Sequence, residues 1–173
     1  MLPRLPVGKA LGLGEGEGRN AIFLAEHGFD VLGVDASAIG LAKAQTLAAQ
    51  KSVTIRTEVA DLRAYTLPSE HYDVITLIFC HLPQPLRTEV FQQAIAGLKP
   101  GGMLVVVLYN PAQRQYQTGG PQDLALLPTL AELQQTLAPL QALVTEEVVR
   151  ELNEGVNHQG PSSVIQYLGR KPA

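Results

Sequence analysis

The chain has 173 residues, of which 46% are hydrophobic and 17% are charged, a composition typical of a folded domain rather than a disordered segment. Its 13 basic and 16 acidic side chains give a formal net charge of −3, which excludes the strongly basic surface that nucleic-acid binding requires. Its one cysteine, Cys80, cannot form an internal disulfide, and no apolar run approaches the ~18 residues of a membrane helix. We therefore expect one cytoplasmic domain over residues 1–173, without a nucleic-acid or membrane partner; no oligomeric state is predicted.

The first half of the chain alternates strand-like and helix-like runs. Strands are predicted over 8–13, 30–35 and 53–59, and helices over 19–27 and 38–50. The run 30–35 is almost wholly apolar, as in a buried strand, whereas 53–59 alternates like a half-buried strand near an edge of the sheet. This order is typical of a parallel sheet that helices cover on both faces.

The second half continues the alternation and then changes character. A buried strand over 72–79, a helix over 86–98 and the most apolar strand, over 103–109 in the middle of the sheet, are followed by a polar loop over 111–121. A helix over 129–137 and two β-rich runs, 142–152 and 163–170, complete the chain, and the turn-rich segment between these runs indicates a hairpin. The predicted fold is α/β: a Rossmann-like, doubly wound, mostly parallel seven-stranded sheet with a C-terminal antiparallel hairpin.

A string of glycines, Gly14-Glu15-Gly16-Glu17-Gly18, lies between the first predicted strand and the first helix. Glycines let a ligand approach the backbone closely, and a helix N-terminus offers unpaired N–H groups. Asp35 closes the second strand 21 residues after Gly14, the spacing at which an acidic side chain accepts hydrogen bonds from ribose hydroxyls. The pattern predicts a site for an adenosine cofactor; a tight turn with a capping aspartate is the alternative interpretation.

The phasing of the glycines separates two cofactor classes. Dinucleotide sites favour G-x-G-x-x-G, whereas the run here is G-x-G-x-G. Asp61 and Leu62 come just after the third strand, at the edge of the sheet where ligands bind in open α/β folds. An aspartate there can meet the exocyclic amine of an adenine, although an aspartate in a loop also forms turns without any ligand.

Five segments together resemble one known family: GLGEGEGRN, VLGVD, ADL, YDVITLIFCHLP and LKPGGMLVVV, in this order and spacing. They resemble the class I S-adenosylmethionine-dependent methyltransferases over about residues 8–170, and within them the tellurite-resistance branch that acts on small molecules. The resemblance implies transfer of a methyl group from S-adenosylmethionine to a small-molecule acceptor, such as a chalcogen oxyanion or a thiol, with S-adenosylhomocysteine as product and no metal. A non-catalytic relative and a nicotinamide-dependent oxidoreductase are the alternatives, and the glycine phasing disfavours the latter.

The resemblance also implies which residues contact the cofactor. Three glycines would face the methionyl part of the cofactor, and acidic side chains would bind its ribose and its adenine. Residues at the end of the fourth strand would lie near its sulfonium, and two residues would cap the first helix beneath its amino-acid end. In chain order these residues are Gly14, Gly16, Gly18, Arg19, Asn20, Asp35, Ala36, Asp61, Leu62, Phe79 and Cys80.

Two features depart from the family pattern. Gly12 stands at the end of the first strand, where the family usually has an acidic residue, and about eight residues precede that strand, where the family has a segment that covers the cofactor. An acid near the ammonium group of the cofactor attracts it, so we expect Gly12→Asp to strengthen binding. We also expect the cover of the cofactor cleft to be short or absent.

Catalytic residues are the hardest to predict, because methyl transfer needs only two aligned partners and the exclusion of water. His81 lies where the substrate cleft should open, and His158 lies in the turn NEGVNHQGP, which the resemblance puts on the substrate side. Either histidine could orient an anion or remove a proton, or else serve only in packing or in a turn. Cys80 and His81 are neighbours on a strand, so their side chains point to opposite faces and cannot act as a thiol–base pair.

Overall fold

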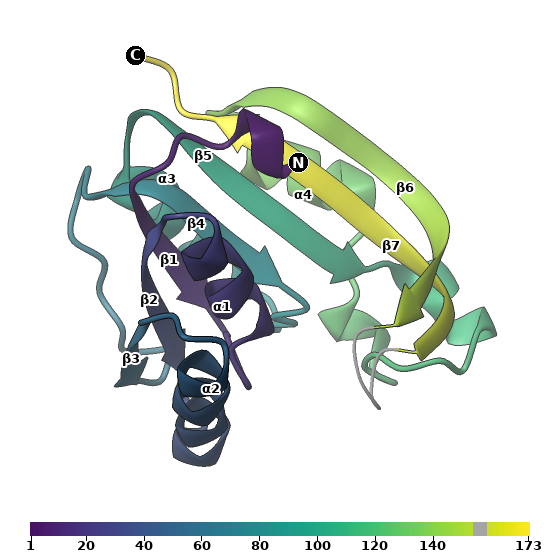
Figure 1. The fold of residues 1–173 in the computed structure, drawn as a ribbon. Coiled ribbons are helices and arrows are strands. Elements are labelled where there is room, and N and C mark those ends of the chain that lie inside the picture. The colour runs from purple at the N-terminus through teal and green to yellow at the C-terminus, as the bar shows by residue number, and fades with distance from the viewer. Residues whose placement is uncertain (154–158) are drawn as a thin grey trace.

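The computed structural model describes residues 1–153 and 159–173. These residues form a seven-stranded sheet with the strand order β3-β2-β1-β4-β5-β7-β6 (Figure 1). The first five strands pair in parallel, whereas β7 is antiparallel to both β5 and β6. The predicted fold, including its antiparallel C-terminal hairpin, is therefore confirmed.

The strands and helices alternate along the chain as the hydrophobic pattern predicts. The strands are β1 (Lys9–Leu13), β2 (Asp30–Asp35), β3 (Arg56–Val59), β4 (Tyr72–Ile78), β5 (Leu98–Tyr109), β6 (Gln141–Asn153) and β7 (Gln159–Arg170). The helices are α1 (Arg19–Glu26), α2 (Ala38–Gln50), α3 (Leu86–Gly97) and α4 (Leu130–Thr136), with short 3-10 turns η1 (Leu2–Arg4), η2 (Pro111–Gln115) and η3 (Leu124–Leu126). Among the described residues, no helix is long and apolar enough to cross a membrane.

The sheet is covered on both faces, and the period-two alternation of its strands assigns each residue to a face. Ala10, Val74 and Val105 pack in one cluster with α1 and α2, while Leu11 and Ile75 pack in another cluster with α3 and α4. Figure 1 shows the same two layers of helices on either side of the sheet. Full burial of each large aliphatic side chain contributes about 1.5–3 kcal/mol, so these two layers supply most of the stability of the fold.

Three strands begin at least three residues away from the predicted start, and one of them, β7, begins at Gln159 rather than at residue 163. The third strand begins at Arg56 rather than at residue 53, and it lies at an edge of the sheet as expected. The fifth strand begins at Leu98, inside the run predicted as helix, because Leu98 pairs with Tyr72 of β4 before the chain turns at Gly101. It is an interior strand, between β4 and β7, and β4 occupies the middle position. Residues 154–158, with the predicted site residue His158, lie outside the described part of the chain.

The topology determines where a ligand can bind. Between β1 and β4 the order of the strands reverses, and in open α/β sheets ligands bind at such a switch point, beyond the carboxyl ends of the strands. The glycine string follows β1, and Phe79 and Cys80 follow β4, so the fold places these segments at the same edge.

Candidate cofactor site

The loop between β1 and α1 packs tightly on one flank and is open at its tip. A Cβ atom on Gly14 would lie 2.5 Å from Cys80 Sγ, and one on Gly18 would lie 2.4 Å from the Cβ atom of Ala44 in α2. Gly16 has a φ of +61°, and a Cβ atom there would meet no heavy atom within 4 Å. Gly14 and Gly18 are thus required by packing, whereas Gly16 leaves an accessible backbone for a ligand.

Asp35 connects this loop to the end of β2. Its carboxylate accepts hydrogen bonds from the Gly16 N–H at 2.8 Å and from the Ser37 N–H at 2.8 Å. Each carboxylate oxygen has a second lone pair, so the group retains the capacity to accept hydrogen bonds from two hydroxyls of a ribose. Ala36 follows directly and is exposed, which leaves the surface beside Asp35 open.

Asp61 lies beyond β3 and forms an ion pair with Arg63, two residues further along the chain. The Arg63 Nε–H donates to both oxygens of the Asp61 carboxylate, at 3.0 and 2.9 Å, and the Arg63 backbone N–H donates at 2.9 Å. Hydrogen bonding to Arg63 lowers the pKa of Asp61 to about 2, so this exposed carboxylate is ionised at neutral pH. The adjacent Leu62 is buried and belongs to the core cluster on the α3 side.

The segment after β4 turns sharply at Phe79. Phe79 has a φ of +55°, which is costly for a residue with a side chain. Its N–H donates to the Val107 carbonyl at 2.8 Å, and its ring centroid lies 4.8 Å from that of Tyr109. Strained residues of this kind cluster at functional sites, and here the turn brings Cys80 against Gly14.

Cys80 is a poor nucleophile in this position. Burial raises the pKa of the Cys80 thiol to about 12, and the negative charge of Asp35 contributes in the same direction. The thiolate, and not the thiol, is the reactive form of cysteine. Cys80 is therefore a buried, protonated thiol that packs against Gly14.

His81 links three segments at the carboxyl edge of the sheet. Its Nδ1 atom lies 3.1 Å from the Leu126 carbonyl oxygen, which accepts its hydrogen, and the Tyr109 N–H points to Nε2 at 3.5 Å. The His81 ring also stacks on the Tyr109 ring with a centroid distance of 5.5 Å. The structure thus places His81 at the predicted edge and gives it backbone partners on η3 and β5.

Glu15 is a site residue that the sequence analysis missed. Only 8% of its surface is exposed, and it accepts a hydrogen bond from the Ala21 N–H at 2.7 Å. Burial raises the pKa of Glu15 to about 7, against the opposing effect of hydrogen bonds from the Ala21 and Asn20 backbones, and the charge of Asp35 raises it further. Glu15, rather than the side chain of Arg19 or Asn20, therefore caps the N-terminus of α1.

Glu15 also contradicts the expectation for Gly12. A Cβ atom on Gly12 would lie only 2.0 Å from Glu15 Oε2, so Gly12→Asp alone forces two carboxylates into one space. The substitution is expected to destabilise the loop rather than strengthen cofactor binding. The sequence signal for Glu15 was the coincidence of an unexpected glycine at position 12 with an acid three residues later.

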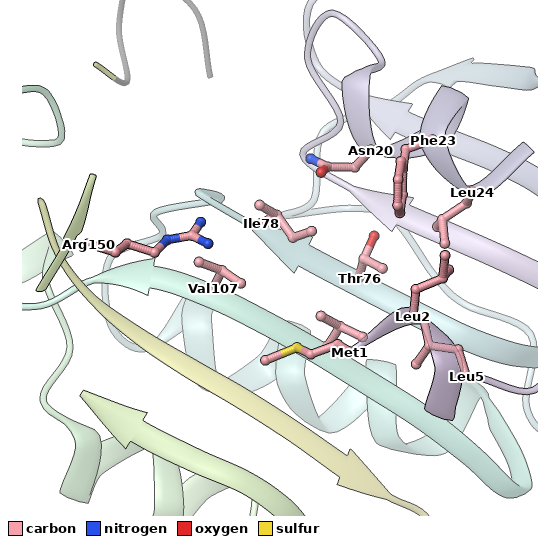
Figure 2. Close-up of a pocket in the computed structure, with 11 residues that line it drawn as sticks. Met1, Leu2, Leu5, Asn20, Phe23, Leu24, Thr76, Ile78, Val107 and Arg150 are labelled. Carbon is pink, nitrogen blue, oxygen red and sulfur yellow. The ribbon is translucent and has the colours of Figure 1, made fainter. Parts of the chain in front are cut away.

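A cavity of about 420 Å³ lies on the α1 side of the sheet. Figure 2 shows its walls: Asn20 and Phe23 from α1, Thr76 and Ile78 from β4, and residues of β5 and η1. The Arg150 side chain of β6 points from the far side toward Ile78. The cavity has the size of a small-molecule site and is mostly apolar, and its lining includes Asn20, two residues after the glycine string in the chain.

The fold and this edge of the sheet together define the class I S-adenosylmethionine-dependent methyltransferase architecture. Residues 10–102 match the family model described as the methyltransferase domain. This match covers more than half of the chain, and the chain therefore belongs to the methyltransferase-domain family. S-adenosylmethionine is the cofactor that this family and fold imply, and the residues fit it: an open backbone at Gly16 stands beside the Asp35 carboxylate.

Three known proteins illustrate the similarity. Hemagglutinin 1 of Eikenella corrodens is 36% identical over 101 residues, which is 57% of this chain and 33% of that protein. The 2-heptyl-1-hydroxyquinolin-4(1H)-one methyltransferase of Mycobacteroides abscessus is 28% identical over 121 residues, 68% of this chain and 53% of that protein. The solved structure of TehB from Haemophilus influenzae superposes with a TM-score of 0.76 at 22% identity, over 94% of this chain and 57% of TehB, and shares the fold. The chain thus aligns with between a third and about half of the length of these two curated relatives.

Proposed function

We propose that this chain transfers a methyl group from S-adenosylmethionine to a small-molecule acceptor and releases S-adenosylhomocysteine. The observation that carries the proposal is the open glycine loop whose tip, Gly16, is held by Asp35 at the switch point of the sheet. The membership of residues 10–102 in the methyltransferase-domain family supports the same activity.

The chain's own residues would hold the cofactor and exclude water. Asp35 would bind the ribose hydroxyls, Asp61 and Leu62 would contact the adenine, and Phe79 and Cys80 would flank the reacting centre. When bound, S-adenosylmethionine supplies a methyl group on a positively charged sulfur. The contribution of the protein is then to align the acceptor and to keep the site dry, and neither task requires a covalent nucleophile.

For the acceptor we propose a soft nucleophile, either a chalcogen oxyanion or a thiol. Cys80 retains its proton, because burial raises its pKa to about 12, and the His81 ring is oriented toward backbone partners. A nucleophile that ionises in solution needs no base from these residues. Because one relative is named for methylation of a hydroxyquinolone, a hydroxylated aromatic compound is the comparison acceptor.

Calorimetric titration with S-adenosylhomocysteine, S-adenosylmethionine and NAD tests the cofactor. We expect both sulfur ligands to bind and NAD not to bind. NAD binding alone would support the oxidoreductase alternative, and binding of none would support a non-catalytic protein. Turnover with tellurite, selenite, small thiols and a hydroxyquinolone, measured as S-adenosylhomocysteine formed, tests the acceptor; activity on the hydroxyquinolone alone would contradict the proposed acceptor class.

We also propose that His158, which lies outside the described residues, serves the acceptor rather than the cofactor. His158→Ala should lower methyl transfer while S-adenosylhomocysteine affinity stays within about twofold, because the residue lies outside the cofactor motifs. His27→Ala is the matched control, since His27 lies on the surface at the far end of α1. An equal loss of methyl transfer and of affinity, or no loss of either, would contradict a role for His158 toward the acceptor.

A further inference from the structure

Two glycines on neighbouring strands create a vacant position on the α1 side of the sheet. Gly12 of β1 and Gly33 of β2 are register partners, and neither contributes a side chain to that face. The Glu15 side chain occupies this space: a Cβ atom on Gly12 would lie 2.0 Å from Glu15 Oε2, and one on Gly33 would lie 3.0 Å from Glu15 Cγ. The three heavy atoms nearest to that Gly12 position all belong to Glu15. We call this space the Gly12–Gly33 socket.

The carboxyl group in the socket is buried, and it has backbone donors but no cation. The Ala21 N–H donates to it at 2.7 Å, and Asp35 at the end of β2 adds a like charge. The nearby charged groups of the loop and of α2 engage one another instead, since Lys43 Nζ lies 2.7 Å from Glu17. Among the described residues, no Lys or Arg forms an ion pair with Glu15. A buried carboxylate without a cation is costly, and such groups concentrate at functional sites.

We propose that Glu15 is a positioning residue for the cofactor: its carboxylate fixes the glycine loop to the N-terminus of α1 and attracts a cationic ligand into the site, as an acid at position 12 would. The inference rests on the proposed function, because it requires a ligand that carries positive charge, and S-adenosylmethionine carries one on sulfur and one on its ammonium group. Glu15 itself touches no reacting atom.

In the free protein, Glu15 is protonated about half of the time near pH 7. Binding of a cation must then favour the ionised form of Glu15. Binding at that pH releases up to about half a proton from this group. The apparent affinity should also rise about tenfold between pH 6 and pH 8, because only the ionised form binds well. Asp35 is the titratable group that faces Glu15, and its carboxylate already accepts two backbone hydrogen bonds. Its negative charge favours the protonated form of Glu15, as burial does.

The test is calorimetric titration of the full chain with S-adenosylhomocysteine, whose ammonium group is the charge probed, in two buffers that differ in their heat of ionisation. We compare the natural chain with Glu15→Gln, which keeps the shape and the acceptor for the Ala21 N–H. The matched control is Glu17→Gln, an exposed acid of the same loop. In the natural chain and in Glu17→Gln we expect proton release at pH 7 and a tenfold rise in affinity between pH 6 and pH 8. In Glu15→Gln we expect neither. Titration of the ligand itself is common to all three proteins and therefore cancels in the comparison.

A relocated acid distinguishes charge from shape. The double variant Gly12→Asp with Glu15→Ala removes the Glu15 side chain from the socket and supplies a carboxylate from β1 instead. It should recover most of the affinity that Glu15→Ala alone loses. Gly12→Asp alone should not bind better than the natural chain. Binding of S-adenosylhomocysteine with equal proton release in the natural chain and in Glu15→Gln would overturn this inference and leave the proposed function intact. Absence of binding to the natural chain at pH 8 would overturn both.

Discussion

Replacement of Glu15 by Gln should change how the stability of the protein depends on pH, and the size of this change follows from burial. Burial raises the pKa of Glu15 from 4.5 to about 7, so the folded state binds this proton more tightly than the unfolded chain does. The resulting contribution to stability is fully present below pH 4.5 and is lost as the pH rises through about 7. A shift of this size corresponds to about 3 kcal/mol when the group is fully ionised.

The assay is urea denaturation of the ligand-free protein at pH 5, 6, 7 and 8, with the free energy of unfolding taken by linear extrapolation. Between pH 5 and pH 8 the natural chain should lose about 2–3 kcal/mol more than Glu15→Gln, which is neutral throughout. Glu17→Gln should follow the natural chain, because Glu17 is exposed and Lys43 lowers its pKa. Parallel pH curves for the natural chain and Glu15→Gln would refute the view that Glu15 is buried with a raised pKa.

Three further predictions concern the loop, the thiol and the segment after β5. Gly16→Ala should abolish cofactor binding but cost only about 1–2 kcal/mol in folding stability, because in the free protein the new side chain enters open space. Gly14→Ala should destabilise the fold more, because its side chain clashes with Cys80. Denaturation measures the effect on folding, and calorimetry measures the effect on binding. Iodoacetamide should modify Cys80 at pH 8 at least about a hundredfold more slowly than free cysteine, because its thiolate is scarce, and mass spectrometry gives the rate. Gln113→Ala should lower the free energy of unfolding by about 2–3 kcal/mol, because its buried amide accepts from the Ser163 N–H at 2.8 Å and donates to the Gly119 carbonyl at 3.1 Å. Gln113→Glu should lose at least as much, because it replaces that donor with a buried carboxylate.

Local patterns were sufficient to predict the fold. Apolar runs separated by helices of regular period determine the parallel strands, and glycines punctuate the turns between them. The boundary at Leu98 could not be predicted in this way, because the helical period continues through that residue. Its strand character comes from pairing with Tyr72, a contact 26 residues distant in the chain.

Which residues of the candidate site lie together could be predicted where the signal is local, but not where it is tertiary. Gly16 and Asp35 were predicted from their spacing, and the structure joins them by a hydrogen bond. Glu15 was missed because an acid in a glycine string resembles an exposed loop residue. Its burial depends on the register that sets Gly12 beside Gly33, and that register appears only when β1 and β2 pair.

The most direct test of the central claim, that the glycine loop and Asp35 form the cofactor site, is a calorimetric comparison of S-adenosylhomocysteine binding to the natural chain and to Asp35→Ala. Asp30→Ala is the matched control, because Asp30 lies at the opposite end of the same strand and pairs with Arg56. Loss of two charge-assisted hydrogen bonds, each contributing about 1.5–3 kcal/mol before compensation, should weaken binding at least about tenfold in Asp35→Ala, and Asp30→Ala should bind as the natural chain does. An unchanged dissociation constant in a folded Asp35→Ala protein would contradict the assignment of this site.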